Sequence, residues 1–147
     1  MKDYRSEIRR LTIAMNKMDG LYYKAARKLG VKDNVLLLLY ALDDGETHTQ
    51  KQICDQWLIS KTTLNTVVKE CADNGYVSLV HNDHSKEKLI ILTEKGHKYT
   101  KVLMEKIYAA EDKAMSHILS LFNNDFITAI EKFSECLQNT FANEELI

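Results

Sequence analysis

A change of hydrophobic period within residues 49–92 limits the possible folds of this 147-residue chain more than any other feature. From Thr49 to Ala72 the apolar residues recur every three or four positions, as they do along one face of an α-helix. Residues 76–80 and 88–92 then have the composition of short strands, and the polar segment 82–87 separates them. We therefore expect two short helices followed by a β-hairpin.

Both short helices have recognisable starting residues. Thr49 and Gln52 fit a capping box, in which each side chain binds a backbone N–H that the first helical turn leaves without a partner. Ser60 is a good N-cap for the second helix, which should end near Asn74-Gly75. The expected inward-facing residues are Ile53, Cys54, Trp57 and Leu58 on the first helix and Leu64, Val67, Val68, Cys71 and Ala72 on the second. This order of elements predicts a helix-turn-helix followed by a wing.

Longer helices are predicted on both sides of this segment, and the chain contains no proline to kink them. A first helix should stop at Gly30, and a second, about 33–44 and apolar nearly all round, at Gly45. Thr93 should cap a long helix, and the segment 123–125 should start the last one. The expected apolar stripes are Ile8, Leu11, Met15, Met18, Tyr22, Ala25 and Leu29 on the first helix, Leu103, Ile107, Ala110, Ala114, Ile118 and Leu121 on the long helix, and Phe126, Ile130, Phe133, Leu137 and Phe141 on the last.

These elements predict an α+β fold that is mainly α with a small β-hairpin wing. We expect a single domain over 1–147, with a winged helix-turn-helix lobe over 33–101 and a helical dimerisation region over 1–30 and 102–147. The outer helices carry more apolar surface than a lobe of about fifty residues can cover, which favours a homodimer. The alternative is a monomer that folds these helices onto itself.

Charge and composition exclude few functions. The net charge is −1, and residues 102–147 carry three lysines against eight acidic residues, so the acidic share is concentrated away from the helix-turn-helix. The longest apolar run, 35–42, is too short to span a membrane, and no basic-then-apolar leader follows Met1, so we expect a cytoplasmic protein. The cysteines Cys54, Cys71 and Cys136 lack a C-x-x-C spacing and are expected to be buried structural thiols, although a redox sensor stays possible.

The residues that face away from the core on the second short helix suit contact with double-stranded DNA. Small hydroxyls, an amide and two cations can enter a major groove, donate to phosphates and bind base edges. Two lysines of the predicted wing could contact the backbone or the minor groove. A solvated amphipathic helix with an ordinary charged hairpin is the alternative. The candidate DNA-binding residues are Ser60, Lys61, Thr62, Thr63, Asn65, Thr66, Lys69, Lys86 and Lys88.

Residues 59–68 (ISKTTLNTVV), 74–77 (NGYV) and 91–96 (ILTEKG) together resemble the MarR (multiple-antibiotic-resistance regulator) family of bacterial transcription factors. The resemblance implies a homodimer, a palindromic operator, and usually a repressor that a small-molecule effector releases from DNA. The wing departs from the family pattern, since His84 and Lys86 stand where an Asp-x-Arg pair is usual. A lysine lacks the planar fork of arginine, which puts minor-groove contact by this wing in doubt.

Other chemistries have weaker support. His81 and His84 could bind a metal, but no cysteine or acid pair completes a ligand set, so no metal and no cofactor are expected. No phosphate loop or nucleophile elbow is present, so the chain is not expected to be an enzyme. Two alternative functions stay open: a winged-helix protein-interaction module, and a ligand- or redox-binding protein without DNA activity. The candidate effector-binding residues are Tyr22, Tyr40, Trp57 and Tyr108.

Overall fold

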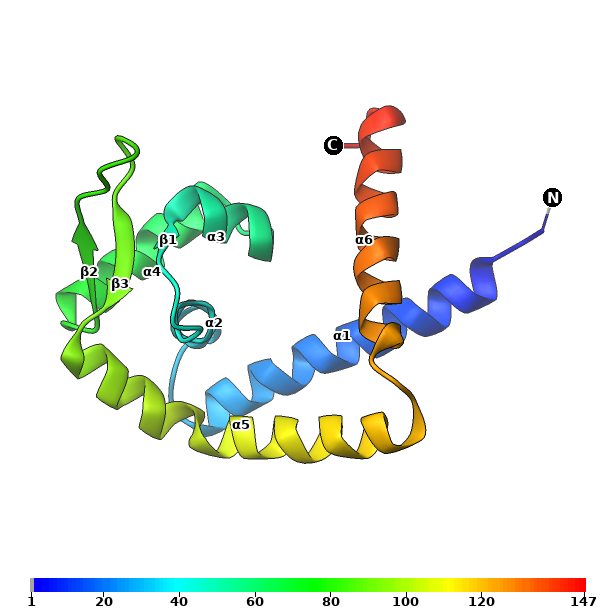
Figure 1. Cartoon of the computed structure of the whole chain (residues 1–147), viewed down its shortest axis with the longest axis horizontal. Helices are drawn as coiled ribbons and strands as arrows, with labels where there is room; N and C mark the ends of the chain where they lie inside the picture. The colour runs from blue at the N-terminus through cyan, green and yellow to red at the C-terminus, as the bar shows by residue number, and fades with distance from the viewer. Residues whose placement is uncertain (1) are drawn as a thin grey trace. The chain divides into compact units, whose positions relative to one another are not determined.

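The computed structural model describes residues 2–147. They divide into two compact units, one up to Glu105 and the other from Lys106 to Ile147. The first unit contains the short helices and the sheet, and the second contains two helical segments (Figure 1). The predicted fold class, mainly α with a small antiparallel β element, is confirmed.

Helices and strands follow the predicted order, with one addition. The elements are α1 (Arg5–Lys28), α2 (Asp33–Leu42), β1 (His48–Thr49), α3 (Gln50–Trp57), α4 (Lys61–Asp73), β2 (Val77–Val80), β3 (Leu89–Leu92), α5 (Glu94–Leu121) and α6 (Asp125–Asn143). Gly30 and Gly45, which follow α1 and α2, both have a positive φ, as predicted for left-handed stops. None of the helices in the described residues is long and apolar enough to cross a bilayer.

The sheet has three strands rather than the two of the predicted hairpin. Its order is β1-β3-β2, and both pairings are antiparallel. His48 of β1 pairs with Ile90 of β3, while Val77 of β2 pairs with Leu92. Strand β1 was not predicted because two residues are too few to show an alternating pattern. It forms because β3 offers it an edge.

The core of the first unit lies between α2, α4 and the sheet, which pack against one another. Leu38, Leu39 and Ile53 are fully buried, as is Leu64 of α4. Of the predicted inward face of α4, the residues Leu64, Val67, Val68 and Cys71 are confirmed as buried.

Several other predicted core residues are exposed in the isolated chain. On the helix-turn-helix, Trp57, Leu58 and Ala72 face solvent. Leu58 is exposed because it is the left-handed C-cap of α3, with φ 49°, where the chain leaves the helical path. Cys54 is half-buried and Cys136 is exposed, so the prediction of a buried thiol is wrong for Cys136, since no residue of α6 is buried.

A hydrogen-bonded joint links the sheet to α5. The Thr93 hydroxyl donates to the Gly75 carbonyl at 2.6 Å and accepts from the Gly96 backbone N–H at 2.9 Å. The Thr93 N–H donates to the Tyr76 carbonyl at 3.0 Å. A Cβ on Gly96 would overlap that same carbonyl group, so only glycine fits. Thr93 therefore caps α5 and, with Gly96, fixes the start of that helix against the two residues that precede β2.

Candidate nucleic-acid interface

Both predicted helix caps are present, one at the start of α3 and the other at the start of α4. The Gln52 N–H donates to Oγ1 of Thr49 at 3.1 Å, and the Thr49 N–H donates to Oε1 of Gln52 at 2.8 Å. The Thr63 N–H donates to Oγ of Ser60 at 3.2 Å. The two helices pack against each other around Ile53 and Leu64. These caps satisfy backbone donors at each helix start and so fix where α3 and α4 begin.

The face of α4 opposite its buried residues presents the predicted polar set. Lys61, Thr62, Asn65, Thr66 and Lys69 are exposed. Neither Lys61 nor Lys69 has an ion-pair partner among residues 2–147, so both ammonium groups can meet phosphates. Two predicted residues differ: Thr63 is half-buried, and the Ser60 hydroxyl donates to Thr63 at 2.8 Å. The hydroxyls of Ser60 and Thr63 are therefore engaged in the N-cap of α4.

Local hydrogen bonds orient two of the exposed polar groups. Nε2 of Gln50 donates to Oδ1 of Asn65 at 2.6 Å, which links α3 to α4 and leaves the Asn65 amide nitrogen as a donor. The Thr66 hydroxyl donates to the Thr62 carbonyl at 3.1 Å, so its oxygen remains an acceptor. Gln50 was not predicted as a site residue, because nothing in the sequence indicates that a glutamine at a helix start contacts a residue fifteen positions away.

The turn between β2 and β3 is held by its own side chains. Oδ1 of Asn82 accepts from the His84 N–H at 3.1 Å, and the Ser85 hydroxyl accepts from the Glu87 N–H at 3.0 Å. Oε1 of Glu87 accepts from the Lys51 N–H at 3.2 Å, so the turn is tied to the start of α3. The predicted contact residues Lys86 and Lys88 are exposed on this turn. Glu87 was also missed, since an acid between two lysines looks like ordinary surface charge.

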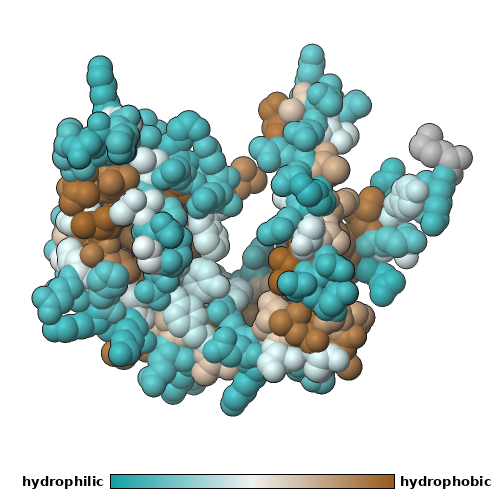
Figure 2. All heavy atoms as spheres, viewed as in Figure 1, coloured by the Kyte–Doolittle hydropathy of each residue, from teal (hydrophilic) through white to brown (hydrophobic). Residues whose placement is uncertain are grey.

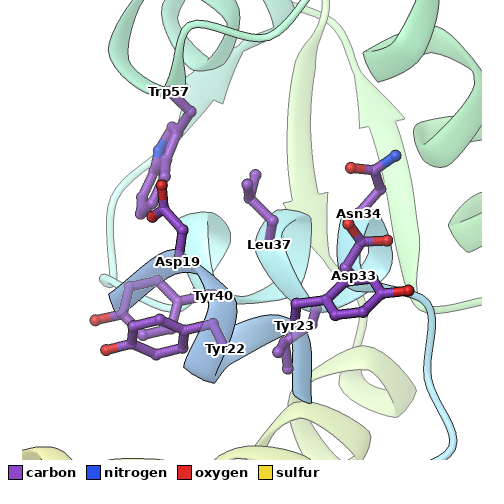
Figure 3. Close-up of a pocket in the computed structure, with 9 residues that line it drawn as sticks. Asp19, Tyr22, Tyr23, Asp33, Asn34, Leu37, Tyr40 and Trp57 are labelled. Carbon is purple, nitrogen blue, oxygen red and sulfur yellow. The ribbon is translucent and has the colours of Figure 1, made fainter. Parts of the chain in front are cut away.

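A cavity of about 470 Å³ lies in the first unit on the side of α2 that faces α1 (Figure 3). It gathers three of the four predicted effector-binding residues, Tyr22, Tyr40 and Trp57. Tyr108 is not among its lining residues. The ring centroids of Tyr22 and Tyr40 are 6.3 Å apart, and those of Tyr40 and Trp57 are 5.8 Å apart, both edge to face. The cavity is also lined by six residues that were not predicted: Asp19, Tyr23, Asp33, Asn34, Leu36 and Leu37.

The histidines and thiols form no metal site in the part of the chain described. No group of three or more His, Cys, Asp or Glu side chains could hold an ion there. His81 lies 3.5 Å from the carboxylate of Asp83. His48 is buried and lies 2.8 Å from Oδ2 of Asp44, and this hydrogen bond lowers the pKa of Asp44. Burial raises the pKa of the Cys71 thiol to about 11, which makes it unreactive.

A capped pair of short helices, an exposed polar face on the second, and a hairpin tied back to the first define a winged helix-turn-helix protein. The model of the MarR family matches residues 29–86 of the chain, which include α2, α3, α4 and β2 but end before β3. The resemblance to the MarR family that was drawn from the sequence is thereby confirmed over these residues. No curated protein matches it in sequence.

Several solved structures share the fold over most of the chain. A MarR family regulator from Neisseria meningitidis is 19% identical, with a TM-score of 0.72 over 98% of this chain and 99% of that one. A MarR family protein from Listeria monocytogenes, complexed with 26mer DNA, is 19% identical, with a TM-score of 0.67 over 98% and 92%. NadR in complex with 4-hydroxyphenylacetate is 16% identical, with a TM-score of 0.67 over 86% and 88%.

Proposed function

We propose that the chain is a cytoplasmic, homodimeric transcription regulator that binds palindromic double-stranded DNA. The observation that carries this proposal is the exposed face of α4, where Lys61 and Lys69 lack ion-pair partners and Gln50 orients Asn65. In this proposal α4 enters the major groove. Lys61 and Lys69 bind phosphates, while Thr62, Asn65 and Thr66 meet base edges. The wing lysines Lys86 and Lys88 bind the backbone beside the groove.

The apolar surfaces of α1 and α6 support the homodimer. No residue of α6 is buried, and one side of that helix carries Ile130, Phe133, Leu137 and Phe141, each between 37% and 40% exposed. Hydrophobic side chains reach the surface along this helix (Figure 2). On α1, Ile8, Met15 and Met18 are likewise exposed. Apolar surface of this extent supports an interface between two copies, and the two α4 helices of such a pair would read half-sites about 34 Å apart.

We further propose that the protein represses transcription and that a small molecule in the cavity beside Tyr22, Tyr40 and Trp57 releases it from DNA. The cavity supports this proposal because it is concave, mostly apolar in its lining and of the size that small ligands occupy. It involves α2 and α3, the helices that support α4. A ligand that moved them would change the position of the DNA-contacting face.

A gel-shift experiment with the DNA upstream of the protein's own gene tests the function, together with palindromes selected by the purified protein. Specific binding should give one retarded species that survives excess nonspecific DNA at moderate salt. A double variant, Asn65→Ala with Lys69→Ala, should lose that species, whereas Lys113→Ala on α5 should keep it. Equal binding by the double variant, or no retarded species with any DNA, would argue against a DNA-binding regulator.

A further inference from the structure

The cavity beside α1 and α2 has an acidic and aromatic lining without a single basic side chain. Its lining residues contribute three tyrosines, one tryptophan, two carboxylates, one amide and two leucines: Asp19, Tyr22, Tyr23, Asp33, Asn34, Leu36, Leu37, Tyr40 and Trp57. All nine belong to the first unit of the chain. A carboxylate ligand would meet two negative charges there, and none of the nine lining side chains is a cation. The charge of the lining therefore favours a cation over an anion.

The aromatic rings offer the complementary feature, since the face of an aromatic ring attracts cations. Tyr22, Tyr40 and Trp57 form a continuous edge-to-face series along one side of the cavity. Arg27 already lies over the ring of Tyr23, with Cζ 5.9 Å from the centroid. One ring of the cavity lining, that of Tyr23, thus already has a cation–π contact within the chain. Trp57 and Tyr22 are 39% and 40% exposed, which leaves apolar ring surface for a ligand to cover.

The two carboxylates lie on different sides of the same space. Figure 3 shows Asp19 with Trp57 and Tyr40 on one side, Asp33 with Asn34 on the other, and Leu37 between them. Asp33 opens α2, where a negative charge also favours the helix start. Asp19 lies in the interior of α1, where no such benefit exists. Lys32, the basic residue next to Asp33, is held away by its ion pair with Glu70 at 3.0 Å.

We propose that this cavity binds an organic cation, an amine or ammonium group joined to an apolar or aromatic body. The ammonium group lies against the rings, between the carboxylates of Asp19 and Asp33, and the apolar body covers Leu37 and the indole of Trp57. This inference deepens the proposed function, because it names the chemical class of the effector. Its binding test needs no DNA, so the two proposals can fail separately.

Three probes with one framework and three charges test the inference: tyramine (cation), tyrosol (neutral) and 4-hydroxyphenylacetate (anion). Trp57 is the only tryptophan in the chain, so its emission reports occupancy of this cavity alone. Calorimetry on the full-length protein supplies the affinities. Tyramine should bind about 10-fold more tightly than tyrosol, because its ammonium group makes one cation–π contact and two partly exposed charge pairs. 4-Hydroxyphenylacetate should bind most weakly.

Matched variants assign the preference to the carboxylates. Asp19→Asn and Asp33→Asn should each weaken tyramine binding about 3-fold and leave tyrosol binding unchanged, which also shows that the cavity is intact. Asp73→Asn, outside the cavity, should change neither. Binding of the anion as tight as the cation, no binding of any probe, or equal tyramine affinity in the asparagine variants would overturn the proposal. A protein that prefers tyramine but retards no DNA would overturn only the proposed function.

Discussion

The side-chain nitrogen of Gln50, the first residue of α3, donates to Oδ1 of Asn65 on α4 at 2.6 Å. This bond connects the two helices on their exposed side and limits the directions in which the Asn65 amide can point. Oδ1 keeps a second lone pair and Nδ2 both hydrogens, so the amide can still bind a base edge in two places. The orientation of the group most able to distinguish bases thus depends on a residue of the neighbouring helix.

Replacement of Asn65 by alanine should therefore relax sequence preference. We expect the variant to lose about 1–3 kcal/mol of discrimination at one base pair of each half-site, with nonspecific affinity unchanged. Gln50→Ala should lose less, because the amide remains but is less restricted. Competition with single-base variants of the operator measures both effects. Gln56→Ala, elsewhere on α3, is the control, and unchanged discrimination in Asn65→Ala would rule out base contact by that residue.

Lys61→Ala and Lys69→Ala should weaken DNA binding without changing sequence preference. Each lysine that neutralises a phosphate releases counterions, so its loss should reduce the slope of log Kobs against log salt concentration by about 1. Binding titrations at several salt concentrations measure this slope. Lys113→Ala, on α5, should leave it unchanged. A wild-type slope in both α4 variants would place these ammonium groups away from the phosphates.

Gly96→Ala should destabilise the fold strongly. The new Cβ would overlap the Tyr76 carbonyl group, so the Thr93 cap must shift, and we expect a loss of about 2 kcal/mol in the free energy of unfolding. Urea denaturation followed by circular dichroism measures it. Gly20→Ala is the matched control: nothing lies within 4 Å of its added Cβ, and helix propensity predicts a gain of roughly 0.5–1 kcal/mol. Equal stabilities of the two variants would contradict the close contact at Gly96.

Stability should fall at high pH because of Cys71. Burial raises the pKa of this thiol from 9.0 to about 11, so between these values the unfolded chain releases the proton and the folded chain keeps it. The Cys71 contribution is therefore complete below pH 9 and is lost as the pH rises towards 11. Urea midpoints across this range should decline less steeply in Cys71→Ala, which has no thiol there. Parallel declines in both proteins would assign the effect to other groups.

Leu137→Glu on α6 should dissociate the proposed homodimer. Leu137 is 40% exposed in the isolated chain, and a carboxylate at that position would be buried without a partner if the helix lies in an interface. Sedimentation velocity should show a monomer for this variant and a dimer for the wild type. Gln138→Glu adds the same charge one residue further and should remain a dimer. A wild-type protein that sediments as a monomer would refute the dimer itself.

Most elements could be predicted from the sequence, because their signals are local. Thr49, Gln52 and Ser60 mark helix starts through bonds that span three residues, and both caps formed as expected. The change in the spacing of apolar residues after α4 likewise predicts the β2–β3 hairpin, because that pattern also lies within a few neighbouring residues. Burial was predicted well only where a helix is covered on one side by its own unit, as at Leu64 and Val67. It failed at Leu58, where a left-handed residue turns the side chain outward.

The sequence by itself determined the order of the elements, their caps and the polar face of α4, since each depends on residues within one or two helical turns. Only the tertiary structure decided that β1 pairs with β3, that Gln50 binds Asn65, and that two acids join the aromatic cavity. Asp19 and Asp33 look like ordinary surface charges in the sequence because their meeting depends on how α1 and α2 pack. Contacts between elements arise from packing in three dimensions, and no local pattern encodes them.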